Sequence, residues 1–242
     1  MKPEEFYQAL SKRGIELNDT QKGQFEDYFH ELVETNKVMN LTSITEKEQV
    51  YLKHFYDSLI LDFFDEGLLT DELTLCDVGS GAGFPSIPLK IVNPNLKITI
   101  IDSLNKRINF LKGLVDKLGL ENVSLVHGRA EELGQNKQYR ENFDLVTARA
   151  VASMTVLTEL CLPFVKKGGQ FIAMKADKAD EELQEATYAI ALLGGKVEKQ
   201  ESFALPNDEG LRNLIFVDKT KETPNKYPRK PGTPSKKPLV KK

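Results

Sequence analysis

Apolar positions recur every three to four residues over roughly the first quarter of the chain. Such a spacing places them on one helical face from 18 to 39, and again from about 46 to 64. A period near 3.6 residues predicts amphipathic helices that bury one face. Asn18, followed by Gln21 three residues later, has the spacing of a capping box at the start of the first of these helices. Neither helix carries residues that suggest catalysis.

The pattern changes near residue 73, where short apolar runs begin to alternate with helical stretches. We expect strands at 73–78, 97–101, 123–127, 143–147, 170–174, 196–203 and 211–218. Helices between the first five strands imply parallel pairing, with both faces of the sheet buried. Only 206–210 separates the last two, which predicts an antiparallel hairpin at the sheet edge. The expected fold is therefore a Rossmann-like α/β sheet of seven strands, mostly parallel, preceded by N-terminal helices.

Charge and composition divide the chain into three parts. We expect an N-terminal helical extension over 1–66, a ligand-binding α/β domain over 67–220, and a basic Pro/Lys-rich tail over 221–242. The tail carries eight Lys/Arg and one acid, and the other 220 residues carry 25 basic and 35 acidic residues. An acidic body with a basic tail suggests a polyanionic partner, although a solvated tail would show the same composition.

The tail also contains five prolines, which disfavour a regular helix or an internal strand. We therefore expect an extended segment whose basic side chains are free to contact nucleic-acid phosphates. The candidates for such contacts are Arg229, Lys230, Lys236 and Lys237.

Several classes of protein are disfavoured by what the sequence lacks. No apolar run reaches the roughly 18 residues of a membrane span, and the first residues lack the apolar core of a signal peptide. Cys76 and Cys161 lie in apolar surroundings, as expected for two reduced thiols in the cytoplasm. We expect no metal site.

A glycine-rich loop follows the first predicted strand. Gly79, Gly81 and Gly83 form G-x-G-x-G, whereas a dinucleotide fingerprint would place its third glycine at Phe84. Glycines at this turn let a ligand approach the backbone at the carboxyl edge of the sheet. The tighter spacing is similar to the methyltransferase loop that wraps the methionine part of S-adenosylmethionine.

Acidic residues follow the second and third strands. Asp102 ends the second strand, 19 residues after Gly83, where a carboxylate can accept hydrogen bonds from both ribose hydroxyls. It could instead cap the helix at 105–118. In methyltransferases the loop after the third strand lies against adenine, which makes Ala130 and Glu131 candidate contacts. An ordinary helix start with acids near its positive end would give the same sequence.

The end of the fourth strand bears on the substrate. The Asn/Asp-Pro-Pro-aromatic motif of adenine amino methyltransferases is absent, and neither cysteine is placed as the nucleophile that cytosine C5 chemistry requires. Arg149 stands there instead and remains protonated, so it cannot act as a base. It suits a purine edge, a phosphate or a carboxylate. A site without a base fits guanine N7, whose lone pair is free.

Motifs across nearly the whole chain resemble one known family, the bacterial 16S ribosomal RNA guanine-N7 methyltransferases called RsmG or glucose-inhibited division protein B. They are 77–88 (DVGSGAGFPSIP), 127–133 (HGRAEEL), 147–152 (TARAVA), 227–239 (YPRKPGTPSKKPL) and 40–42 (NLT), with His54 and 57–59 (DSL). The resemblance implies a class I methyltransferase fold, S-adenosylmethionine as cofactor and one guanine of 16S rRNA in the small ribosomal subunit as substrate. It also implies cofactor contacts from Gly79, Phe84, Ala130, Glu131 and Arg149.

Three other functions are compatible with parts of the pattern. A methyltransferase of the same fold could act on another RNA or a small molecule, but the basic tail argues against a small molecule. A non-catalytic RNA-binding assembly protein could keep a vestigial loop, but the glycines and Asp102 are all present. A dinucleotide oxidoreductase is disfavoured by Phe84.

Overall fold

One mixed sheet forms the centre of the molecule. In the computed structural model, which describes residues 1–64, 73–176 and 178–241, the sheet has seven strands in the order β3-β2-β1-β4-β5-β7-β6. The strands are β1 (Thr74–Val78), β2 (Lys97–Asp102), β3 (Val123–His127), β4 (Phe143–Arg149), β5 (Val165–Lys175), β6 (Gly195–Ala204) and β7 (Leu211–Lys219). Strands β1 to β5 pair in parallel, and β7 is antiparallel to both β5 and β6. The predicted parallel sheet with an antiparallel edge hairpin is confirmed.

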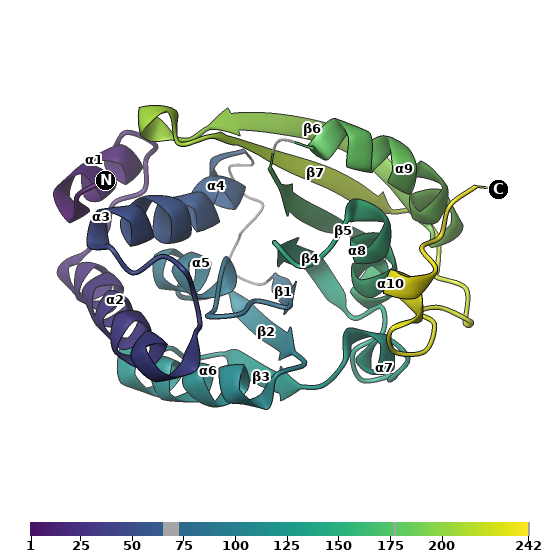
Figure 1. Ribbon diagram of the computed structural model, residues 1–242, viewed down its shortest axis with the longest axis horizontal. Helices are drawn as coiled ribbons and strands as arrows, with labels where there is room; N and C mark the ends of the chain where they lie inside the picture. Colours follow the sequence, from purple (N-terminus) through teal and green to yellow (C-terminus); the bar gives the residue numbers. More distant parts are fainter. Residues whose placement is uncertain (65–72, 177, 242) are drawn as a thin grey trace.

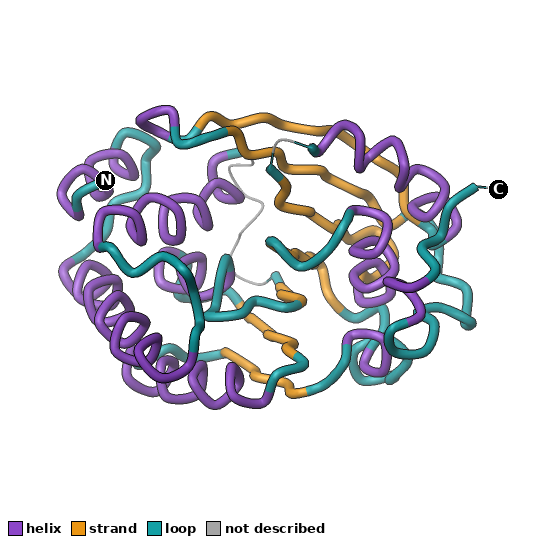
Figure 2. The backbone as a smooth tube through the Cα atoms, viewed as in Figure 1, coloured by secondary structure: helices purple, strands orange, loops and turns teal. Residues whose placement is uncertain are grey.

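Helices cover both faces of this sheet (Figures 1 and 2). The N-terminal group is α1 (Pro3–Ser11), α2 (Asp19–Met39), α3 (Lys47–Val50), the π-helix η1 (Tyr51–Tyr56) and α4 (Asp57–Phe63). The later helices are α5 (Ser86–Val92), α6 (Asn105–Leu118), α7 (Ala130–Leu133), α8 (Met154–Cys161), η2 (Leu162–Phe164), α9 (Ala179–Leu192), η3 (Pro206–Asp208) and α10 (Thr233–Lys236). Helices α1 to α6 pack on one face, and α7 to α10 lie on the other.

Successive strand residues point to opposite faces and so contribute to two separate cores. In β1, Leu75 packs in the core with the N-terminal helices, whereas Cys76 packs in the core with α8 and α9. In β4, Leu145 and Val146 divide in the same way. Because both faces are covered, the central strands β1 and β4 are buried and largely apolar on both sides, which explains their continuous apolar runs in the sequence.

The N-terminal helices begin and end where local sequence dictates. Asn18 caps α2 by accepting the Gln21 backbone N–H at 2.9 Å, and the Gln21 side chain accepts the Asn18 N–H at 2.9 Å, so the predicted capping box is confirmed. The helix predicted at about 46–64 is one helical run from α3 through η1 to α4. The predicted boundary between 66 and 67 lies outside the described residues.

The C-terminal segment does not extend freely, so that prediction is wrong. Tyr227 and Pro228 are buried, and 233–236 forms the short helix α10. Arg229 makes hydrogen bonds to both carboxylate oxygens of Glu159, a residue of α8 that is only 1% exposed. A buried carboxylate requires a partner, and the C-terminal segment supplies it.

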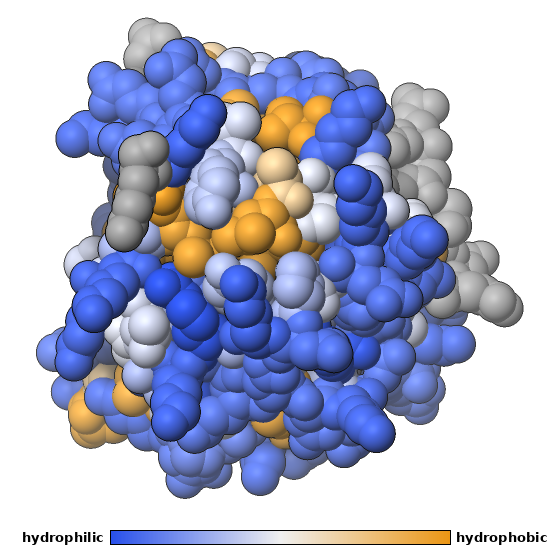
Figure 3. Space-filling model, turned by 90° about the vertical axis from the view of Figure 1, so that its right-hand side faces the viewer, coloured by the Kyte–Doolittle hydropathy of each residue, from blue (hydrophilic) through white to orange (hydrophobic). Residues whose placement is uncertain are grey.

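The surface is mainly polar outside these cores. Figure 3 shows a largely hydrophilic face with a small hydrophobic area near its centre. Within the described ranges, no helix combines the length and the apolar character needed to cross a bilayer.

Candidate active site

The glycine loop between β1 and α5 is the first part of the site. Gly79 and Gly81 have φ of 79° and 63°, in the left-handed region that favours glycine. A Cβ on Gly79 would lie 2.9 Å from a methyl group of Val151, whereas a Cβ on Gly81 would meet nothing within 4 Å. Gly79 is therefore needed for close packing, and Gly81 leaves open space above the loop.

Asp102 joins this loop to the end of β2. Its side chain is 2% exposed, and its Oδ2 accepts the Gly81 backbone N–H at 3.2 Å. Its Oδ1 accepts the Leu104 N–H at 2.8 Å, and Leu104, rather than Asp102, is the N-cap of α6. The carboxylate is thus held at the edge of the sheet beside the glycine loop, and its binding of a ribose remains a prediction.

A cavity of about 380 Å³ opens at this edge. It is lined by Val78, Gly79, Ile101, Asp102, Ser103, Arg107, Gly128, Arg129, Ala130, Glu131, Ala150, Val151, Ala152, Val156, Leu160 and Ser235. Four of the predicted cofactor residues therefore come together in one cavity: Gly79, Asp102, Ala130 and Glu131.

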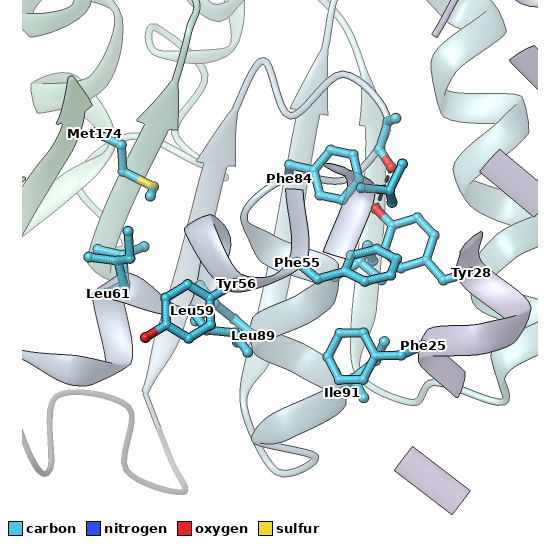
Figure 4. Packing of buried hydrophobic residues seen from close by; sticks show 14 of the residues in the cluster. Phe25, Tyr28, Phe55, Tyr56, Leu59, Leu61, Phe84, Leu89, Ile91 and Met174 are labelled. Atoms are coloured by element: carbon cyan, nitrogen blue, oxygen red, sulfur yellow. Dashed lines mark hydrogen bonds between the residues drawn. The ribbon is translucent and has the colours of Figure 1, made fainter. Parts of the chain in front are cut away.

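Gly83 and Phe84, whose contact with the cofactor remains a prediction, both face the N-terminal helices. Figure 4 shows the Phe84 ring beside Tyr28 and Phe55. The Phe84 ring stacks on Tyr28 at 5.3 Å and on His54 at 4.5 Å between ring centres. A Cβ on Gly83 would lie 2.8 Å from the Tyr28 hydroxyl oxygen, and that hydroxyl donates to the Ala82 carbonyl at 2.6 Å. These contacts hold the loop against the N-terminal helices, so both residues support its shape from behind.

Arg149 lies in a second cavity of about 600 Å³. This cavity is lined by Ile44, Lys53, His54, Asp57, Arg149, Ala150, Met174, Lys175, Ala176, Lys178, Glu182 and Arg212. Asp57, the first residue of α4, accepts hydrogen bonds from Arg149 at 2.6 Å and from Arg212 at 2.8 Å. One carboxylate therefore fixes two guanidinium groups that come from β4 and β7.

His54 is a further neighbour of Arg149. Burial, and then the positive charge of Arg149, lower the pKa of His54 to about 3, so the ring is neutral. Its Nδ1 lies 3.4 Å from an Arg149 nitrogen, which can only donate, and its Nε2 lies 2.8 Å from the Thr42 hydroxyl. Nδ1 is therefore the acceptor and Nε2 carries the proton.

Sequence reasoning missed the contribution of the N-terminal helices to the second cavity. Lys53, His54 and Asp57 all line it, although these helices carried nothing that suggested catalysis. The available signal was polar residues close to the apolar face of the helix predicted at 46–64. Arg212 lies in the predicted hairpin strand at 211–218, and nothing in the local pattern connects that strand with the helix predicted at 46–64.

The two cavities meet at Ala150, which lines both. Ala150 has φ of 55°, a left-handed conformation that costs a non-glycine residue about 1–2 kcal/mol. It follows Arg149 directly, so the chain turns sharply where the cofactor cavity gives way to the arginine-lined cavity. A group bound in one cavity could therefore reach a group bound in the other at this point.

Two buried polar atoms beneath the loop have no hydrogen-bond partner among the described residues, Asp77 Oδ1 and Ser80 Oγ. Burial raises the pKa of Asp77 to about 7, against the lowering effect of its hydrogen bonds from Ser86. An unpaired buried polar group costs about 1–3 kcal/mol, which a polar ligand at the loop could relieve. No cluster of three or more His, Cys, Asp or Glu suited to a metal occurs within the described part of the chain.

The sheet order, the glycine loop and the acid at the end of β2 define a class I methyltransferase, the class that uses S-adenosylmethionine. The fold is similar to that of a SAM-dependent methyltransferase from Aquifex aeolicus, with a TM-score of 0.52 and 19% identity, covering 71% of this chain and 93% of that one. Its cofactor fits the site here: open backbone at Gly81, a buried carboxylate placed for the ribose and a cavity that Ala130 and Glu131 help to line.

The sequence comparisons give the particular family. The model of the rRNA small subunit methyltransferase G family, GidB, matches residues 21–211. A protein named ribosomal RNA small subunit methyltransferase G from Staphylococcus saprophyticus is 61% identical over 97% of both chains. One of the same name from Lactobacillus acidophilus is 60% identical over 99% of this chain and all of its own length. The chain belongs to the rRNA small subunit methyltransferase G family.

Proposed function

We propose that the protein methylates N7 of one guanine in 16S rRNA, within the small ribosomal subunit or its precursor in the cytoplasm. The observation that carries the proposal is the junction of two cavities at Ala150, one built for the cofactor and the other lined by arginine and lysine. The relatives' shared name, which specifies small-subunit ribosomal RNA, supports the choice of substrate.

In the first cavity the chain would hold S-adenosylmethionine by its backbone and two acids. The main chain at Gly81 leaves room for close approach of the methionine part, and Gly79 lines the cavity beside it. Asp102 would accept from the ribose hydroxyls, and Ala130 and Glu131 would lie against adenine. Bound there, the cofactor supplies a methyl group on a positively charged sulfur, which a neutral nitrogen can attack.

In the second cavity the chain would bind and orient the base. Its described lining carries five cationic side chains and two acidic ones, so the cavity is net positive and suits an anionic RNA. Arg149 lies at the junction, where its fixed donors can contact a purine edge or a phosphate. We assign Arg149 to substrate positioning.

No lining residue of the second cavity is disposed to act as an essential base. Asp57 is held by two arginines, and Glu182 pairs with Lys175 at 2.7 Å and accepts the Met154 N–H at 2.7 Å. The neutral His54 ring accepts from Arg149. Guanine N7 has a free lone pair and loses no proton on methylation, so alignment alone suffices for this target.

Asp57 is a positioning residue in this scheme. Its two hydrogen bonds hold Arg149 and Arg212 in place, and Arg149 in turn lies 5.1 Å from the Phe84 ring centre behind the glycine loop. The N-terminal helices would thus align the substrate-binding arginine with the cofactor loop.

The role of the exposed C-terminal lysines in RNA binding is part of the proposal. Lys230, Lys236 and Lys237 are exposed and available to phosphates, whereas Arg229 is engaged by Glu159. We therefore expect the lysines to contribute a salt-dependent share of the RNA affinity and Arg229 to contribute to the fold.

The test is to map 7-methylguanosine in rRNA from a strain that lacks the gene. We expect one modified guanine of 16S rRNA to lose its methyl group, and the wild-type gene to restore it. The Asp102→Ala gene should restore less. An unchanged methylation map in the deletion strain would refute the proposed function.

A further inference from the structure

The C-terminal segment reaches the cofactor cavity, although every cofactor residue identified in the sequence lies between 79 and 149. Ser235 of α10 is one of the lining residues of that cavity. We propose that residues 232–235 form the wall of the cofactor site at its adenine end, with Ser235 facing the base. This inference depends on S-adenosylmethionine binding in that cavity, as proposed above.

A direct hydrogen bond connects the segment to the predicted adenine contact. The backbone N–H of Gly232 donates to Oε1 of Glu131 at 2.9 Å, and Glu131 is only 7% exposed. This bond fixes the carboxylate of a residue that itself lines the cavity. Arg129 lies 3.5 Å from the same oxygen but is half exposed, so the backbone bond is the stronger constraint.

The segment is anchored firmly enough to serve as a wall. Arg229 pairs with the buried Glu159 of α8 at 2.6 Å, and its guanidinium also donates to the Lys237 carbonyl at 2.8 Å. These two contacts hold the chain on both sides of α10. Pro234, within α10, is buried, and the Gln135 side chain donates to the Pro228 carbonyl at 2.9 Å.

The position of α10 relative to its neighbours identifies which end of the cavity it closes. It packs against α8, and α8 supplies Val156 and Leu160 to the same cavity. Glu131, at the end of the cavity predicted to hold adenine, is the residue that Gly232 contacts. Two apolar side chains, a fixed carboxylate and a serine hydroxyl suit a flat heteroaromatic base with polar edges.

The experiment measures ligand affinity by calorimetry for wild type, Ser235→Trp and Lys236→Trp. The ligands are S-adenosylhomocysteine and 5′-methylthioadenosine, which lacks the amino-acid part. Ser235→Trp should weaken both ligands by about tenfold or more, because an indole cannot share the cavity with adenine. Lys236→Trp is the matched control, since Lys236, like Ser235, is exposed in α10 but does not line the cavity. Both ligands should bind it as they bind wild type.

Hydrogen exchange on the unmodified protein provides a measurement that needs no variant. Added S-adenosylhomocysteine should slow amide exchange in 232–237 as well as in the glycine loop. If wild type binds the ligand but α10 exchange and Ser235→Trp affinity are both unchanged, the inference is wrong. Weakening of S-adenosylhomocysteine alone would place α10 at the methionine end and also overturn it. If wild type binds neither ligand, the proposed function itself fails.

Discussion

Replacement of Asp57 by asparagine should uncouple RNA methylation from cofactor binding. The side chain of Asp57 is 6% exposed and joins Arg149 at 2.6 Å to Arg212 at 2.8 Å. Asparagine keeps the shape but removes the charge, and its amide nitrogen would face one of the two guanidinium groups. Arg149 would then lose the contact that holds it at the junction of the two cavities.

The geometry sets the size of the effect. A hydrogen bond to a charged group contributes about 1.5–3 kcal/mol, and breaking a buried ion pair costs about 3–5 kcal/mol. Arg149 and Arg212 are 13% and 21% exposed, so water partly compensates. We therefore expect Asp57→Asn to lower the free energy of unfolding by about 3 kcal/mol.

The assay compares kcat/KM for small-subunit rRNA with the affinity for S-adenosylhomocysteine, below the unfolding temperature of each variant. Asp57→Asn should lower kcat/KM by about tenfold or more, while cofactor affinity changes by less than about twofold, because Asp57 does not line the cofactor cavity. Asp62→Asn, on the same helix and outside both cavities, is the control and should keep wild-type methylation. Equal losses of methylation and cofactor affinity in Asp57→Asn would refute the positioning role.

Asp102→Ala should weaken S-adenosylhomocysteine by about ten- to a hundredfold in calorimetry, and unchanged affinity would contradict the ribose role. His54 is buried in its neutral form, so its contribution to stability is complete above pH 6.5 and is lost as the pH falls toward 3. In His54→Gln the free energy of unfolding should therefore depend less steeply on pH between about 6.5 and 3. At saturating cofactor, single-turnover methylation should show no acidic limb between about pH 6 and 9. Only the cofactor KM should change near pH 7, where Asp77 titrates, and this pH dependence should be absent in Asp77→Asn. Glu159→Gln should lower the free energy of unfolding by about 2–3 kcal/mol in denaturant titrations, through loss of the Arg229 pair, and an unchanged midpoint would contradict that.

The central sheet and one cavity were accessible to sequence reasoning because their determinants are local. Alternating apolar runs and helices fix a parallel sheet, and the short link at 206–210 fixes the hairpin. Parallel strands end at one edge, so Gly79, Asp102 and Glu131 had to converge there.

The contacts that sequence reasoning missed join residues far apart in the chain. Composition showed the prolines and lysines of the tail, but gave no sign that Glu159, buried in α8, would bind Arg229. Likewise, Phe84 follows the glycine loop directly, yet its ring turns away from the cavity because Tyr28 and His54 offer an aromatic stack. Pairing of this kind depends on which elements pack together, and a local pattern does not contain that information.

The most direct test of the proposed function is methylation by the purified protein of small subunits taken from cells that lack it. The subunits are incubated with S-adenosylmethionine, and the 16S rRNA is digested and examined by nucleoside mass spectrometry and position mapping. We predict close to one 7-methylguanosine per subunit, at a single position, with wild type and with Asp62→Asn, and much less with Asp57→Asn. Methylation of a different base or atom, or none with a protein that binds the cofactor, would contradict the assignment.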